Sequence, residues 1–165
     1  MLKQIKRIHR LYETRFSFGA SAAIITNLGL IVGLRTGSHA KFSIIGSMLV
    51  IALADNVSDS VGIHIYQESE CLEQKEVWLS TFTNFFSRLL VSLTFIALVY
   101  FLPIGIGVVS SLIWGLSLLS FMSYMIAKDR GINPYWAICE HLCIALLVII
   151  VSNFVGGIIL SRIKF

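Results

Sequence analysis

The chain contains an uncharged run of 39 residues, 89–127, in which no Asp, Glu, Lys or Arg occurs. As one straight helix this run would be about 58 Å long, whereas the hydrocarbon core of a bilayer is only about 30 Å thick. Pro103, followed by Gly105, breaks the run, because proline and glycine interrupt helices. The run therefore predicts two membrane-spanning helices joined by a tight turn, which we place at 80–101 and 107–127.

Three more apolar segments are each long enough to cross a bilayer once, at 16–34, 42–65 and 135–160. With 56% hydrophobic and 13% charged residues, the chain has too few charged side chains to cover a soluble domain of this size. The sequence therefore predicts an all-α integral membrane protein, with one five-helix domain over 1–165 and a short acidic loop at 66–78. No cleaved signal peptide is expected, because no small-residue cleavage site is evident.

Lys and Arg residues are distributed unevenly between the two sides of these spans. Eight lie on the side of the N-terminus: Lys3, Lys6, Arg7, Arg10, Arg15, Lys75, Lys128 and Arg130. Four lie on the other side: Arg35, Lys41, Arg162 and Lys164. Because Lys and Arg accumulate in cytoplasmic loops, we expect the N-terminus in the cytoplasm and the C-terminus on the opposite side of a prokaryotic cytoplasmic (inner) membrane. We interpret the positive charge as this topology signal and expect no nucleic-acid partner.

Two aspartates, Asp55 and Asp59, interrupt the second apolar segment. Ionisable residues within a membrane span are rare and usually serve a function. On an uninterrupted α-helix they share one stripe with Ser58, and Met48 lies further along the same stripe. Carboxylate and hydroxyl oxygens suit hard divalent cations, and a thioether adds affinity for softer ones. These four residues, together with Glu140 in the last span, are the predicted metal ligands, whereas His64 falls on the opposite face and is not counted.

Arg88 in the third span offers the aspartates a partner inside the protein. From the rise of a helix, Arg88 lies about 12 Å and Asp59 about 9 Å from the cytoplasmic ends of their spans, so the two match in depth. Asp55 has no evident counter-charge, and Glu140 in the last span adds a third acidic group. One arginine leaves an embedded charge of about −2, which protonation, a divalent cation or both would neutralise. A transport site and a structural ion pair therefore both remain open.

Several other residues are secondary candidates. Small residues on one face of the first span predict helix packing, within the chain or against a second copy; they are Ala22, Thr26, Gly29 and Gly33. Asn27 lies off that face and is an accessory candidate ligand.

The remaining candidates lie near the predicted cytoplasmic side. Cys139, His141 and Cys143 surround Glu140 and form a weaker candidate ligand cluster. Glu68 and Glu70 in the acidic loop would attract cations toward the mouth of the site. No nucleophile elbow, HExxH, P-loop or GxGxxG motif occurs, so we do not expect an enzyme.

Three segments resemble the vacuolar iron transporter family. The first span, from Phe18-Gly19 to Leu34, is similar to the family's first-helix pattern, roughly GGxDGLVTTLGLVAGL. Residues 51–68 are similar to its second helix, roughly GALSMAAGEYLSVRSQRE. Residues 131–159 are similar to its last helix, which closes on a glycine before two apolar residues. The likeness covers most of the chain, and the number of expected helices agrees.

The resemblance implies proton-driven export of ferrous iron or manganese from the cytosol, by a homodimer whose first helices line the path. No tightly bound cofactor is implied, and the surroundings are membrane lipid. Asp59 stands where the family has a Glu, Asp55 where it has a Met, and Ala22 where it has an Asp. Residues 66–78 replace a long glutamate-rich insert. The alternative is a non-transporting membrane protein that keeps the fold and pairs its buried charges internally.

Overall fold

The protein is built entirely from helices over the residues that can be described. The computed structural model describes the backbone of residues 2–162 and the side chains of residues 17–159 and 162, and no strand occurs within them. In chain order the elements are α1 (Leu2–Leu34), α2 (Ala40–Val50), the π-helical turn η1 (Ile51–Asp55), α3 (Asn56–Ser69), α4 (Gln74–Phe101), α5 (Ile104–Asp129) and α6 (Pro134–Arg162).

Five helical stretches in the described part are long and apolar enough to cross a membrane, which confirms the predicted fold class. They cover 17–34, 40–69, 74–101, 104–129 and 134–159, and α2, η1 and α3 together make the second of them. The prediction of a loop at 66–78 is wrong at both ends, because only residues 70–73 lie between α3 and α4. Glu, Gln and Lys are good helix formers, so their charge does not end a helix.

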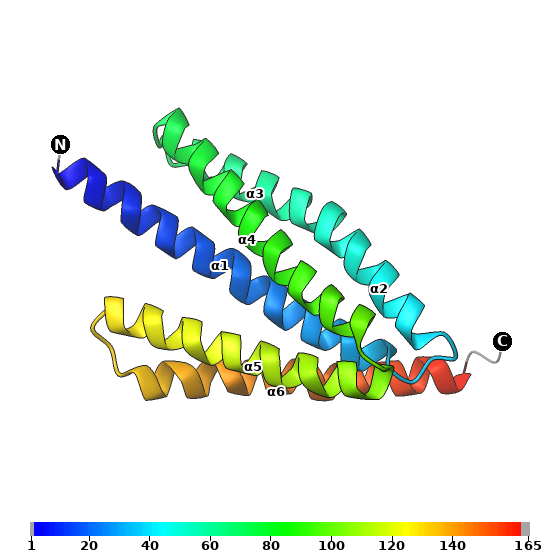
Figure 1. Ribbon diagram of the computed structural model, residues 1–165. Helices are drawn as coiled ribbons and strands as arrows, with labels where there is room; N and C mark the ends of the chain where they lie inside the picture. Colours follow the sequence, from blue (N-terminus) through cyan, green and yellow to red (C-terminus); the bar gives the residue numbers. More distant parts are fainter. Residues whose placement is uncertain (1, 163–165) are drawn as a thin grey trace.

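Helix α1 lies at the centre of the bundle and packs against α4, α5 and α6. Figure 1 shows that the start of α1, the α3–α4 turn and the α5–α6 turn lie at one end of the molecule. The α1–α2 turn, the α4–α5 turn and the end of α6 lie at the other. This arrangement agrees with five successive crossings. The cytoplasmic placement of the first end stays a prediction from the Lys and Arg distribution, and the side chains of residues 3–15 and 164 lie outside those described.

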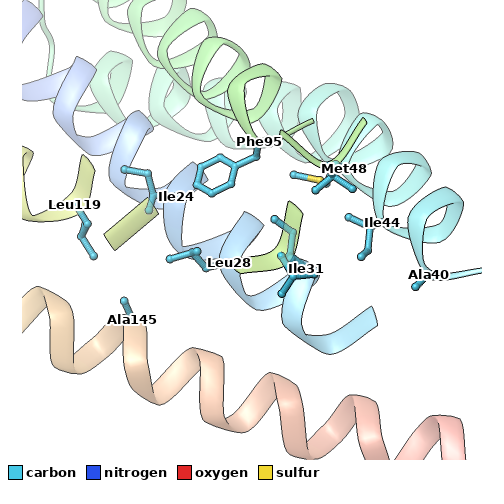
Figure 2. Close-up of a cluster of buried hydrophobic side chains, with 11 residues drawn as sticks. Ile24, Leu28, Ile31, Ala40, Ile44, Met48, Phe95, Leu119 and Ala145 are labelled. Carbon is cyan, nitrogen blue, oxygen red and sulfur yellow. The ribbon is translucent and has the colours of Figure 1, made fainter. Parts of the chain in front are cut away.

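The hydrophobic core lies where α1 meets the second and third spans. Leu28 and Ile31 of α1, Phe95 of α4 and Met48 of α2 are fully buried, and their side chains converge in Figure 2. Gly115 of α5 lets this core close, because a Cβ there would lie 2.8 Å from Leu28 Cδ2.

The π-helical turn η1 interrupts the second span and ends at Asp55, four residues before Asp59. The Asn56 amide stabilises it by donating to the carbonyl oxygens of Ala52 at 3.3 Å and of Phe85, in α4, at 2.8 Å. A π turn holds about one residue more than an α turn, so the preceding residues are rotated by about 100° relative to an uninterrupted helix. Met48 is therefore turned off the aspartate stripe and into the core, and its prediction as a metal ligand is wrong.

The small residues of α1 bring it close to α6. A Cβ at Gly29 would lie 3.0 Å from Ser152 Oγ, and one at Gly33 would lie 3.4 Å from the Ser152 carbonyl oxygen. Both glycines therefore serve the helix packing predicted for them, within the chain. Ala22 and Thr26 are half-buried.

Candidate functional site between the second and third spans

The Asp55 and Asp59 side chains converge on Arg88 of α4. Nη1 of Arg88 donates to Asp59 Oδ2 at 2.9 Å, and Nη2 donates to Asp55 Oδ2 at 2.5 Å. The predicted match in depth between Arg88 and Asp59 is confirmed. The expectation that Asp55 lacks a counter-charge is wrong, because the planar guanidinium presents separate nitrogens to the two carboxylates.

A polar stripe on α4 supports these ion pairs. The Asn84 amide donates to Asp59 Oδ2 at 3.1 Å and to Ser60 Oγ at 3.2 Å. The stripe continues through further buried polar residues: Ser80, Ser87 and Ser92. These residues were not predicted, although positions 80, 84, 87, 88 and 92 repeat at helical spacing within an apolar segment. That spacing is the sequence signal for the polar face of α4, which contacts the aspartates through Asn84 and Arg88 and contacts Asn27 of α1 through Ser92.

Burial is unequal across the ion pairs. The Arg88 side chain is 8% exposed, whereas the side chains of Asp59 and Asp55 are 33% and 54% exposed. Two carboxylates facing one guanidinium leave the site with a formal charge of about −1. This remaining negative charge lies on the two carboxylates, which are more exposed than the guanidinium.

A groove of about 450 Å³ opens beside Asp59, between α1 and α3. It is lined by Phe18 of α1 and by Ser58, Asp59, Gly62, Ile63 and Tyr66 of α3. The predicted stripe on the second span is thus confirmed C-terminal to the π turn, where Ser58 and Asp59 share one wall. Gly62 keeps the groove open, because no atom of the described residues lies within 4 Å of the position its Cβ would take.

The other candidate ligands lie elsewhere. Asn27 is buried between α1 and α4, where its amide donates to the Ala23 carbonyl oxygen at 2.8 Å and to Ser92 Oγ at 3.0 Å. Glu140 is exposed on α6. Among the described residues, no three His, Cys, Asp or Glu side chains are placed to hold one metal ion. Glu140 therefore does not complete a carboxylate cluster with Asp55 and Asp59, contrary to its predicted place among the ligands.

The thiols of Cys139 and Cys143 are free and exposed on the same helix. His141 turns away from them toward α5, where its Nδ1 lies 2.7 Å from Ser123 Oγ. The predicted ligand cluster of Cys139, His141 and Cys143 is therefore not assembled within the described residues.

The acidic residues at the α3–α4 turn are also separate from the aspartates. Glu68 lies 3.4 Å from His64 Nε2 and accepts a hydrogen bond from Gln74 at 3.3 Å, and Glu70 is exposed at the end of α3. His64 Nδ1 lies 3.1 Å from Thr81 Oγ1, so His64 also packs against α4, the helix that contacts both aspartates. The predicted placement of His64 on the opposite face of the second span is therefore not confirmed.

Asp59 and Ser58 thus place hard oxygen donors in the wall of a groove inside a membrane span. The Asp59 and Asp55 carboxylates share the Arg88 guanidinium. Comparison of the chain with protein-family models, with curated proteins and with solved structures finds no match.

Proposed function

We propose that this protein is a membrane transporter of divalent metal cations, iron or manganese, which exports them from the cytosol in exchange for protons. The observation that carries the proposal is the convergence of Asp55 and Asp59 in the middle of a span, with Asp59 in the wall of a groove. Placing two carboxylates there is unfavourable unless they meet a cation. The likeness to vacuolar iron transporters supports the same function.

The oxygen donors of one chain are too few for a complete divalent site, because such ions take about six ligands. We propose that two copies face each other across the grooves between α1 and α3, so that the first helices line the path. Each copy brings a formal charge of about −1, and one divalent cation between two copies would neutralise the pair. Protons that replace the metal on the carboxylates would then release it, which couples export to a proton gradient.

Flux through reconstituted protein tests the proposal. Asp55→Asn with Asp59→Asn, combined with Arg88→Gln to keep the interior neutral, should reduce manganese flux to the level of empty liposomes, because no carboxylate remains. The measurement is uptake of Mn²⁺ into liposomes that hold a pH gradient and a metal-sensitive dye. Size-exclusion chromatography confirms that the variant is folded, and unchanged flux in a folded variant would contradict the proposal.

The groove offers a second, independent test. Gly62→Leu should abolish Mn²⁺ flux by filling the groove beside Asp59, while the fold is kept because no atom lies within 4 Å of that Cβ position. Leucine also favours a helix over glycine by about 1 kcal/mol. Gly46→Leu is the matched control, since Gly46 is equally open, lies on the same span and does not line the groove. Equal flux in the two variants would exclude the groove as part of the path.

The contact of Arg88 with both aspartates favours one other function, a non-transporting membrane protein that pairs its charges internally. It predicts that exchanging the charges, with Arg88→Asp and Asp59→Arg, preserves stability. It also predicts that Mn²⁺ does not raise the melting temperature of the wild-type protein. A rise in melting temperature that needs both aspartates would exclude this alternative.

A further inference from the structure

Arg88 lies where a transported cation would have to bind. Its two terminal nitrogens contact the Oδ2 atoms of Asp59 and Asp55 at 2.9 and 2.5 Å. Its side chain is 8% exposed, so it cannot leave for solvent without a movement of α4 against the second span. A site dedicated to a metal ion would not ordinarily hold a fixed cation at its centre, and this feature is not explained by transport alone.

Because arginine stays charged, Arg88 remains on Asp55 and Asp59 unless a cation that binds them more tightly replaces it. The guanidinium keeps its charge at all accessible pH values, so deprotonation cannot free the carboxylates. A metal ion at Asp55 and Asp59 must therefore displace Arg88 or remain beside its positive charge. Either course lowers the affinity of the carboxylates for the metal.

The surroundings of Arg88 are compatible with two states, one with Arg88 on the carboxylates and one with a metal ion in its place. When the guanidinium withdraws, the Asn84 amide still donates to Asp59 Oδ2 and keeps that carboxylate oriented. Asp59 lines the groove and Asp55 is 54% exposed, so an incoming ion reaches both carboxylates although Arg88 is buried. The Arg88 guanidinium, which is part of the chain, and a free metal ion would thus exchange at the same two carboxylates.

We propose that Arg88 is a competing cation of the transport site. It occupies Asp55 and Asp59 when no metal is bound, and it weakens metal binding enough for the ion to be released on the far side. This regulation rests on the proposed transport function. It assigns to Arg88 a role in setting metal affinity, in addition to its ion pairs.

Equilibrium binding of Mn²⁺ to the purified full-length protein in detergent tests the assignment. Arg88→Gln should bind Mn²⁺ at least about tenfold more tightly than wild type, because a positive charge within contact distance of the ion is removed. Arg35→Gln is the matched control, since it removes the same charge from the other end of the bundle, where Arg35 donates to Asn153 Oδ1 at 2.9 Å. Its affinity should equal that of wild type. Adding Asp59→Asn to Arg88→Gln should abolish the gain.

Two further measurements keep the test decisive. If Arg88→Gln does not fold, Arg88→Lys replaces the forked guanidinium by one ammonium and should give a smaller gain in affinity. Added methylguanidinium should weaken Mn²⁺ binding to Arg88→Gln and leave binding to wild type unchanged. Mn²⁺ flux by wild type together with unchanged or weaker affinity in the folded Arg88 variants would overturn this inference alone. Absence of both flux and Mn²⁺ binding in every variant would overturn the transport function itself.

Discussion

Replacing both aspartates while Arg88 is kept should destabilise the protein more than replacing Arg88 while the aspartates are kept. For Asp55→Asn with Asp59→Asn we expect the free energy of unfolding to fall by about 3 kcal/mol, the lower end of the usual range for breaking a buried ion pair. The reason is that Arg88 is 8% exposed and cannot lose its charge. The aspartates are 33% and 54% exposed, so leaving them unpaired removes less buried charge from its partner, and Arg88→Gln should cost less.

The measurement is unfolding in mixed micelles with increasing denaturing detergent, followed by helical circular dichroism. The triple variant with Asp55→Asn, Asp59→Asn and Arg88→Gln is the control, because it removes every charge and should recover most of the lost stability. If the two aspartate substitutions and Arg88→Gln cost the same, or if the triple variant adds both losses, the three side chains do not act as one charged cluster.

The membrane fold follows from the sequence because hydrocarbon sets strict limits on length and charge. The uncharged run 89–127 must be divided, and α4 and α5 divide it at Leu102–Pro103. The ends of the helices at the predicted acidic loop were not predicted correctly. Tyr66–Ser69 and Gln74–Trp78 are polar and lie in helices, since charge marks where a span leaves the membrane and not where hydrogen bonding within a helix stops.

The sequence predicts those features of the site that follow from the regular rise of an α-helix. It does not predict those that depend on a local change in the helix, such as the π turn. The depths of Asp59 and Arg88 agree because both follow from 1.5 Å per residue. Met48 was misplaced because the π turn at Ile51–Asp55 changes the rotation of the helix, and no spacing of apolar residues reveals such a turn. Asp55 pairs with the same arginine because the Arg88 side chain extends from α4 to the second span. The number of residues between the two positions does not predict such a contact.

Gly156 should be the least replaceable glycine at the contact of α1 with α6. A Cβ at this position would overlap the carbonyl oxygen of Gly33 and lie 2.8 Å from its carbonyl carbon. Both are backbone atoms, so the helices must move apart, and the close packing of Gly29 against Ser152 and Val148 would be lost with them. For Gly156→Ala we expect a loss of about 3 kcal/mol in the free energy of unfolding, the upper end of the usual cost of overpacking.

The neighbouring glycine supplies the matched control for this substitution. Nothing lies within 4 Å of a Cβ at Gly157, so Gly157→Ala should leave stability unchanged or raise it by up to about 1 kcal/mol through helix propensity. Denaturing-detergent titrations of the two variants give the comparison. Opposite signs are expected because the two glycines, adjacent in sequence, lie on different faces of α6. Equal effects would mean that α6 does not cross α1 at Gly33 in the membrane, and the central position of α1 in the bundle would have to be abandoned.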